Sequence, residues 1–228
     1  MSKSKGNVIY PETLIDRYGL DSVRYFLLRE VPVSQDGVFS PEEFVERYNF
    51  DLCNDLSNLL NRTVSMVNKY FEGKVPNYNG TPNEVDEEFE KFTLEQIAKF
   101  EEKMEELEIA NALQEIWGLI SRTNKYIDET MPWALAKEEE QREKLASSMY
   151  HLIENLRKIA ILIKPFMNDT AENIFRQIGV EAENLKMWDS IKTQDGLKDI
   201  KVIEKGEPIF MRLKPEEEIE YLKSIMKK

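Results

Sequence analysis

Two polar residues four positions apart could bind a nucleotide base. Asn58 and Arg62 have helical spacing, so a helix would present an amide and a guanidinium side by side on one face. Such a pair can hydrogen-bond to an unpaired base and stack on it. Spacing alone also fits a more common arrangement, in which Arg62 forms a surface ion pair and Asn58 is solvated.

Trp133 is a third candidate for the same chemistry. It follows Pro132, which is expected to end or kink a helix. At a helix break an indole can project into solvent and stack on a base. The alternative is a position in the core, which we expect for the other two tryptophans, Trp117 and Trp188.

The start of the chain has a composition that suits phosphate binding. Residues 1–9 are small, polar and basic, and lead to a helix start at Pro11. Mobile ammonium groups and a backbone that can approach closely are what a polyphosphate needs. The alternative is a disordered N-terminus, which is common for such residues.

The sequence offers little for other chemistry. His151, the single histidine, falls within an expected helix and is interpreted as a core or boundary residue rather than a catalytic one. With Cys53 as the single cysteine, the chain has no internal disulfide or thiolate zinc site, and we expect this thiol to be buried and inert. The acidic clusters lack calcium-loop spacing, so no metal site is expected.

Composition favours a helix-rich, soluble chain with a real core. The 228 residues are 41% hydrophobic and 32% charged, with 9 glycines and 9 prolines. No apolar run is long enough to span a bilayer and no signal peptide opens the chain, so we expect a cytoplasmic protein without a membrane partner. A formal charge of −12 argues against a general nucleic-acid binder. The acid is concentrated over 84–108 and 138–140, however, which leaves room for a selective RNA contact by a few side chains.

Capping signals and apolar periodicity predict an antiparallel helix bundle. Ser40, Pro41 and Glu43 begin a long helix that continues to Phe71, and Asp21 is expected to cap an earlier one. A small hairpin or extended pair is expected from 201–204 and 209–213. Helices are also expected over 11–18, 22–29, 85–104, 109 to the break before Pro132, 141–163, 170–178 and 215–228. We expect three parts: residues 1–40, a bundle over 41–195, and a C-terminal hairpin and helix over 196–228 that pack back.

Several stretches of the sequence resemble one enzyme family. Met1-Ser2-Lys3-Ser4, followed by Lys5-Gly6-Asn7-Val8-Ile9, resembles the end of the lysine-methionine-serine-lysine-serine signature of class I aminoacyl-tRNA synthetases. Longer stretches over 17–30, 36–40, 54–62 and 132–137 resemble methionyl-tRNA synthetases in particular. The resemblance covers essentially the whole chain and is highly specific in combination.

This resemblance implies a fold, an activity and roles for the candidate residues. The fold would be the anticodon-binding bundle with a stem-contact N-terminal extension. The activity would be the ATP-dependent ligation of methionine to its tRNA through methionyl-adenylate, with Mg²⁺ accompanying ATP. The signature residues Met1, Ser2, Lys3 and Ser4 would bind ATP, with Lys3 stabilising charge on the triphosphate. Asn58, Arg62 and Trp133 would recognise the CAU anticodon of the methionine tRNA.

The resemblance also has gaps. The first signature lysine, the nucleotide-binding fold with its histidine motif, and the zinc knuckle of many members have no counterpart here. We therefore expect this chain to be inactive without the catalytic domain of the same enzyme. Some members of the family also carry a further C-terminal oligonucleotide-binding domain; we expect none within these 228 residues, and the oligomeric state stays open. Two other hypotheses remain: an acidic helical protein-interaction module, and the corresponding part of another class I synthetase.

Overall fold

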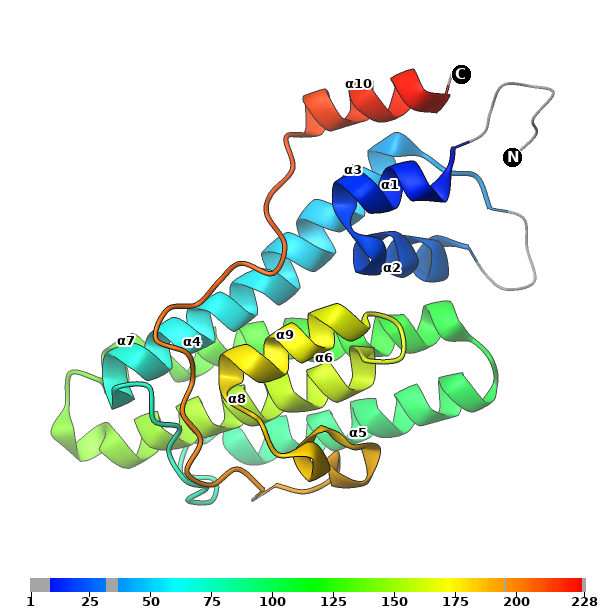
Figure 1. Ribbon diagram of the computed structural model, residues 1–228. Coiled ribbons are helices and arrows are strands. Elements are labelled where there is room, and N and C mark those ends of the chain that lie inside the picture. Colours follow the sequence, from blue (N-terminus) through cyan, green and yellow to red (C-terminus); the bar gives the residue numbers. More distant parts are fainter. Residues whose placement is uncertain (1–8, 32–36, 195, 227–228) are drawn as a thin grey trace.

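The computed structural model describes residues 9–31, 37–194 and 196–226, and within these ranges the fold is helical (Figure 1). The expected helix bundle is confirmed. The helices are α1 (Pro11–Tyr18), α2 (Leu20–Glu30), α3 (Pro41–Arg47), α4 (Asn58–Phe71), α5 (Asp86–Glu105), α6 (Ile109–Thr130), α7 (Pro132–Leu135), α8 (Arg142–Ile163), α9 (Asn168–Ile178) and α10 (Pro215–Met226). A π-helix, η2 (Tyr48–Ser57), joins α3 to α4, and three single-turn 3₁₀ segments are η3 (Glu139–Gln141), η4 (Glu183–Lys186) and η5 (Trp188–Ser190).

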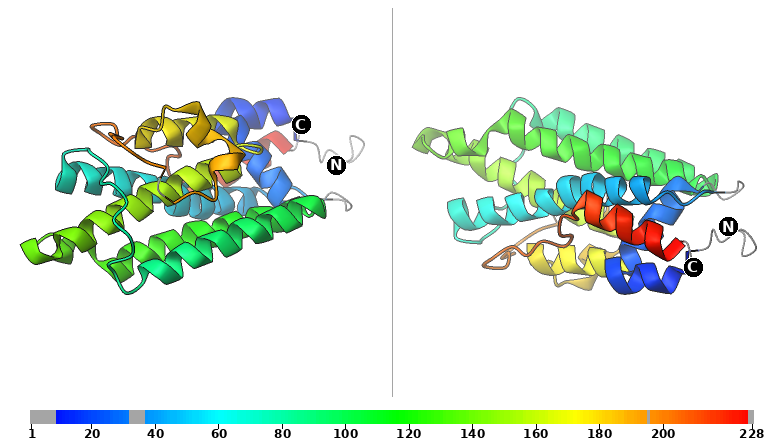
Figure 2. Two further views of the ribbon diagram at one scale, coloured as in Figure 1. Left: turned by 90° about the horizontal axis from the view of Figure 1, so that it is seen from below. Right: turned by 90° about the horizontal axis from the view of Figure 1, so that it is seen from above.

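The long helices α5, α6 and α8 form the body of the bundle, with α4 packed beside them (Figures 1 and 2). α8 is the central helix, because nearly all of its residues from Leu145 onward are buried. α1, α2, α3 and α10 gather at one end of the bundle, where α10 packs on α3. α7 and the C-terminal end of α4 lie at the opposite end.

Local signals determine where most helices begin and end. The hydroxyl of Ser40 accepts a hydrogen bond from the Glu43 amide at 3.2 Å, as a helix-capping serine should. α1 ends at Gly19 and α9 ends at Gly179, both with positive φ. α6 ends at Met131, which adopts a left-handed conformation directly before Pro132. The breaks expected at these positions are confirmed.

The expected capping role of Asp21 is wrong. α2 begins at Leu20, two residues before the expected start at 22, so Asp21 lies within its first turn. The Asp21 carboxylate instead accepts a 2.7 Å hydrogen bond from the Thr170 amide, near the start of α9. A carboxylate at a helix N-terminus satisfies an unpaired amide and complements the helix dipole. Asp21 therefore joins two segments that are far apart in sequence.

The long helix expected from Ser40 to Phe71 is interrupted. Its middle turns form the π-helix η2 instead of an α-helix. Side chains from elsewhere bind this segment: Trp117 Nε1 donates to the Asp51 carbonyl at 3.2 Å, and Asn124 Nδ2 donates to the Asp55 carbonyl at 3.2 Å. These tertiary hydrogen bonds use carbonyl oxygens of the segment, so its winding depends on α6 as well as on local sequence.

The hairpin expected from 201–204 and 209–213 is absent, and the described part of this region is an extended tail along the bundle. Its backbone groups bond to other elements rather than to each other. Val202 N donates to the Gly73 carbonyl, Ile203 N to the Gln177 carbonyl, and Leu213 N to Asn49 Oδ1. An isolated antiparallel bridge joins Lys201 to Lys74. The terminal helix α10 follows at Pro215, as expected.

Three of the four expectations about single side chains are confirmed. His151 and Cys53 are buried, and Trp117 is 8% exposed. Trp188, expected in the core, is instead 38% exposed. The centre of its ring lies 5.9 Å from the centre of the Phe100 ring. Trp188 lies on the short 3₁₀ turn η5 at the surface and not on one of the long helices of the bundle. None of the helices in the described ranges is long and apolar enough to cross a membrane.

Candidate nucleic-acid interface

α4 presents a single row of exposed side chains. Its only exposed residues are Asn58, Arg62, Ser65 and Lys69, spaced four, three and four positions apart. This spacing keeps all four on one helical face, while the opposite face supplies Leu59, Leu60 and other buried residues to the core. We call these four residues the α4 row. The structure therefore brings Asn58 and Arg62 together on one exposed face, as the spacing predicts.

Arg62 has a partner that the sequence does not reveal. Its guanidinium lies 3.4 Å from the Asp128 carboxylate on α6, and both side chains are substantially exposed. An exposed ion pair of this length contributes little to stability, on the order of 0–1 kcal/mol. Arg62 is thus held in a preferred direction by a contact that an incoming ligand can replace at low cost.

Trp133 is exposed directly after the break at the end of α6. Met131 takes a left-handed conformation, Pro132 occupies the first position of α7, and Trp133 follows with 45% of its surface exposed. Exposure of nearly half of an indole leaves a ring surface available for stacking. The sequence left two positions open for Trp133, in the core or exposed, and the structure shows the exposed one.

Trp133 lies at the same end of the bundle as the C-terminal half of the α4 row. α6 follows α4 in the same direction, because Asn124 bonds to Asp55 and Asp128 pairs with Arg62. α7 continues from α6 beside the C-terminal end of α4 (Figures 1 and 2). The amide and the guanidinium therefore share one exposed face of α4, and the exposed indole follows at the end of the bundle towards which α4 runs; single-stranded loop recognition uses these kinds of groups.

The extended tail forms hydrogen bonds with η2 at the N-terminal end of α4. The hydroxyl of Ser57 accepts from the amides of Ile209 and Phe210, at 3.1 and 3.3 Å. Asn49 forms a two-way contact with Leu213, accepting from its amide and donating to its carbonyl. Because Asn49 and Ser57 are buried, these bonds are protected from water and stiffen the base of α4.

One carboxylate beside the α4 row has a shifted pKa. Burial, together with the neighbouring charge of Asp51, raises the pKa of Asp55 to about 6. Removing this half-buried carboxylate from water disfavours its charged form. At neutral pH the negative charge of Asp55 therefore lowers the free energy of unfolding.

The signature residues Met1, Ser2, Lys3 and Ser4 lie outside the described residues. The helix that follows them, α1, is fixed to the C-terminal helix. Glu218 of α10 receives two hydrogen bonds from the Arg17 guanidinium, at 2.7 and 2.8 Å, and one from the Tyr18 hydroxyl at 2.6 Å. The hydroxyl bond and burial raise the pKa of Tyr18 well above its usual value, so the phenol stays protonated as a donor.

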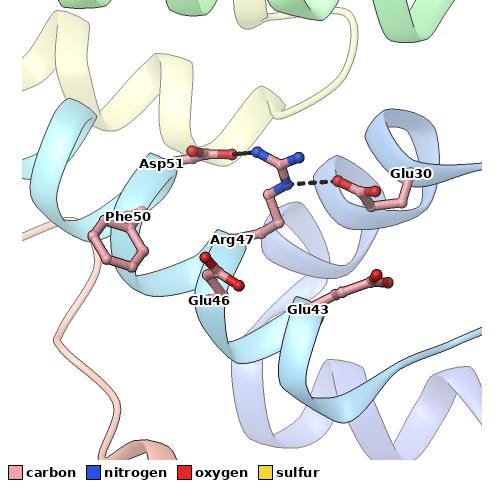
Figure 3. A pocket seen from close by; sticks show the side chains of 6 residues that line it. All are labelled: Glu30, Glu43, Glu46, Arg47, Phe50 and Asp51. Carbon is pink, nitrogen blue, oxygen red and sulfur yellow. Dashed lines mark hydrogen bonds and ion pairs between the residues drawn. The ribbon is translucent and has the colours of Figure 1, made fainter.

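A pocket of about 420 Å³ lies between α2, α3 and η2 (Figure 3). Its lining is acidic, with Arg47 as its single cation: Glu30, Glu43, Glu46, Arg47, Phe50 and Asp51. Arg47 is already occupied, because it bonds to Glu30 at 2.5 Å and to Asp51 at 3.4 Å. Four carboxylates around an occupied guanidinium would repel a phosphate, so this pocket does not suit RNA or a nucleotide. No group of three or more potential metal ligands occurs among the residues that the structure describes.

Sequence reasoning missed several side chains around the candidate interface. Asp128 lies 66 positions after Arg62 in the sequence, and no local sequence pattern predicts a contact between residues so far apart. Ser65 and Lys69, in contrast, continue the spacing of Asn58 and Arg62, so helical periodicity alone could have identified them.

Comparisons with known protein families agree over most of the chain. Residues 1–64 match a family described as tRNA synthetases class I (M). Residues 75–226 match the anticodon binding domain of methionyl tRNA ligase.

Individual relatives give the same result. The chain is 57% identical over 226 residues to the methionine–tRNA ligase of Bacillus subtilis (strain 168), covering 99% of this chain and 34% of the relative. It is 55% identical over 228 residues to the methionine–tRNA ligase of Listeria innocua, covering 100% of this chain and 34% of the relative. The chain thus spans about a third of the length of these curated relatives.

Solved structures share the fold. A Mycobacterium tuberculosis methionyl-tRNA synthetase bound by methionyl-adenylate superimposes with a TM-score of 0.85 at 33% identity, covering 92% of this chain and 41% of that one. The apo form of the same organism's enzyme gives 0.83 at 31% identity, covering 92% and 42%.

Proposed function

Because this chain belongs to the methionyl-tRNA synthetase family, we propose that it is the tRNA-recognising part of a methionine–tRNA ligase. In this proposal Asn58, Arg62 and Trp133 bind the unpaired bases of a CAU anticodon. The methionine tRNA and the catalytic domain of the same enzyme are its partners. The alternative of an acidic protein-interaction module is not favoured by the family assignment.

The main support for RNA recognition is the chemistry of the exposed residues on the α4 row and at Trp133. Arg62 offers five donors in a plane, Asn58 offers an amide that both donates and accepts, and Trp133 offers a ring surface. Together they supply edge recognition and stacking for bases that are splayed out of a loop. An anticodon is such a set of unpaired bases.

For the whole enzyme we propose the ligation of methionine to its tRNA through methionyl-adenylate, with ATP and Mg²⁺ as co-substrates. Lys3 would stabilise negative charge on the triphosphate as the methionine carboxylate attacks the α-phosphate, and Met1, Ser2 and Ser4 would complete this loop. The division into 1–40, 41–195 and 196–228 is part of this proposal. The helix that follows the loop, α1, is fixed to α10 by the contacts of Arg17 and Tyr18 with Glu218.

The proposal is tested by titrating the chain with an RNA stem-loop that carries a CAU anticodon. Trp133→Ala and Arg62→Ala are each expected to weaken binding by about 1–3 kcal/mol, because each removes a stacking or edge contact. Helicity should change little, since both side chains are exposed. Trp188→Ala is the matched control, because it removes an exposed indole from a 3₁₀ turn elsewhere.

Stem-loops with altered anticodons complete this test. The unsubstituted chain should bind the CAU loop more tightly than any altered loop, and Arg62→Ala should reduce that preference. Equal affinity for all loops would contradict the proposal. A preference for a different anticodon would instead point to another class I synthetase.

A further inference from the structure

The α4 row continues beyond the residues that the proposed function uses. Asn58 and Arg62 form its first half, and Ser65 and Lys69 form its second half. At 1.5 Å per residue the row is about 16 Å long, which exceeds what a single base needs. The second half lies at the end of the bundle where α7 presents Trp133 (Figure 1).

The charge of this row is unusual for the chain. Its four members include two cations and no carboxylate, in a protein with a net charge of −12. Among the residues that the structure describes, no carboxylate lies within ion-pairing distance of Lys69, whose ammonium group rests 5.2 Å from the centre of the Tyr70 ring. Lys69 is therefore a cation available for a ligand.

The tail runs directly beside this row. Asn68 donates to the Ile203 carbonyl at 2.8 Å, and Gly206 lies against Asn61, where a Cβ would come within 2.6 Å of the amide oxygen. Asn61 and Asn68 each precede a member of the row by one position, so the tail follows the adjacent line on the helix surface.

Lys205 is a basic residue of the tail where the tail runs along α4. It is exposed and stands between the two tail residues that contact α4, Ile203 and Gly206. No described carboxylate pairs with it in the structure. Two lysines without a described carboxylate partner, Lys69 on α4 and Lys205 on the tail beside it, thus lie along the same stretch of α4 as the exposed Ser65.

We propose that Ser65, Lys69 and Lys205 bind phosphates of the RNA strand that continues from the bases held by Asn58, Arg62 and Trp133. This inference rests on the proposed function and extends its site. Ammonium groups bind phosphates as point charges, and a hydroxyl can donate to a phosphate oxygen. Such contacts position the RNA without reading its sequence, whereas the first half of the row and Trp133 read the bases.

Salt dependence distinguishes a phosphate contact from a base contact. Each phosphate contact to a single strand contributes about 0.7 to the slope of log affinity against log salt concentration. Lys69→Gln and Lys205→Gln are each expected to reduce the slope for the CAU stem-loop by about this amount. Each should also weaken binding by about three- to tenfold at low salt, and by the same factor for every anticodon. Glutamine is a good helix former, so Lys69→Gln should leave α4 intact.

Lys91→Gln on α5 is the matched control, because Lys91 is an exposed helical lysine away from the row. Its slope should equal that of the unsubstituted chain. If Arg62→Ala loses affinity while Lys69→Gln and Lys205→Gln behave like Lys91→Gln, the phosphate site is refuted and the proposed function survives. If none of these variants changes binding, or if the chain does not bind the stem-loop, both are refuted. A loss that differs between anticodons would show that Lys69 or Lys205 reads bases, which also contradicts the inference.

Discussion

The exposed faces of α4 and α5 differ in charge although both helices pack against the same core. α4 exposes two cations and no carboxylate. α5 exposes five glutamates and two lysines among its nine exposed residues: Glu87, Glu88, Lys91, Leu94, Glu95, Ala98, Lys99, Glu102 and Glu105. Net charge is therefore a poor guide to what this molecule can bind, because the acid is concentrated on a face other than the α4 row.

This difference gives each face a distinct effect on RNA. A polyanion is repelled by α5 and attracted by the α4 row, so the charge pattern favours one orientation of approach. Two carboxylates beside the row also have altered electrostatics. Asp128 is paired with Arg62, and the pKa of Asp55 is raised to about 6 by burial and by Asp51. Of the following three predictions, the first and the last test whether this contrast controls binding, and the second tests the effect of the Asp55 charge on stability.

The largest effect is expected from placing a carboxylate in the α4 row. In Ser65→Glu the new side chain lies three positions after Arg62 and four before Lys69, so it can pair with both cations. It should also repel phosphates, and we expect about tenfold weaker binding of the CAU stem-loop, or more, in filter-binding or fluorescence titrations. Lys91→Glu makes a comparable change on α5 and should alter affinity by less than about twofold. Equal losses in the two variants would mean that the position of the charge is unimportant.

A smaller effect is expected on stability when the charge of Asp55 is removed. The pKa of Asp55 is about 6 in the folded chain and about 4 when unfolded, so the folded state binds more protons between these values. Stability should therefore fall as pH rises from 4 to 6 and stay reduced above that. Asp55→Asn should stabilise the chain by about 1 kcal/mol at pH 8, after allowing for solvent screening of a half-exposed group.

Urea unfolding at pH 8 and pH 4 measures this effect. The gain from Asp55→Asn should shrink towards zero at pH 4, where the carboxylate of the parent chain is mostly protonated in the folded state. Asp16→Asn on α1 is a control, because Asp16 is exposed and lies away from η2. A gain that is independent of pH would show that charge is not its cause.

The smallest effect is expected from releasing Arg62. Asp128→Asn removes the ion pair and one negative charge beside the row, so RNA should bind about two- to fivefold more tightly, as expected for an exposed pair worth under about 1 kcal/mol. The gain should diminish as salt is added. Weaker binding would mean that Asp128 orients Arg62 for recognition rather than competing with RNA.

Most of the fold could be predicted because its boundaries are marked locally. Pro11, Ser40 and Gly179 begin or end helices by their own backbone chemistry, and apolar periodicity indicates which faces are buried. The tail could not be predicted in this way. Its alternating apolar residues reflect an extended, half-buried chain, but its hydrogen-bond partners belong to α9, η2 and the segment after α4.

For the candidate interface as well, features set by local spacing could be predicted, and contacts between distant segments could not. The shared face of Asn58 and Arg62 follows from their spacing, whereas the break at Pro132 left both an exposed and a core position open for Trp133. The pairing of Arg62 with Asp128 depends on how α6 packs beside α4, and the position of Lys205 depends on the path of the tail. Contacts between distant segments leave no periodic signal in a single sequence, so only the structure reveals them.

The central claim is that Trp133 and the α4 row bind unpaired bases. The fluorescence of Trp133 during an RNA titration tests this claim most directly. Titration with the CAU stem-loop should quench tryptophan fluorescence in parallel with binding, because a stacked base contacts the exposed indole. The quench should be absent in Trp133→Phe and weaker with altered anticodons. Binding of the stem-loop without any quench, or an undiminished quench in Trp133→Phe, would contradict the account.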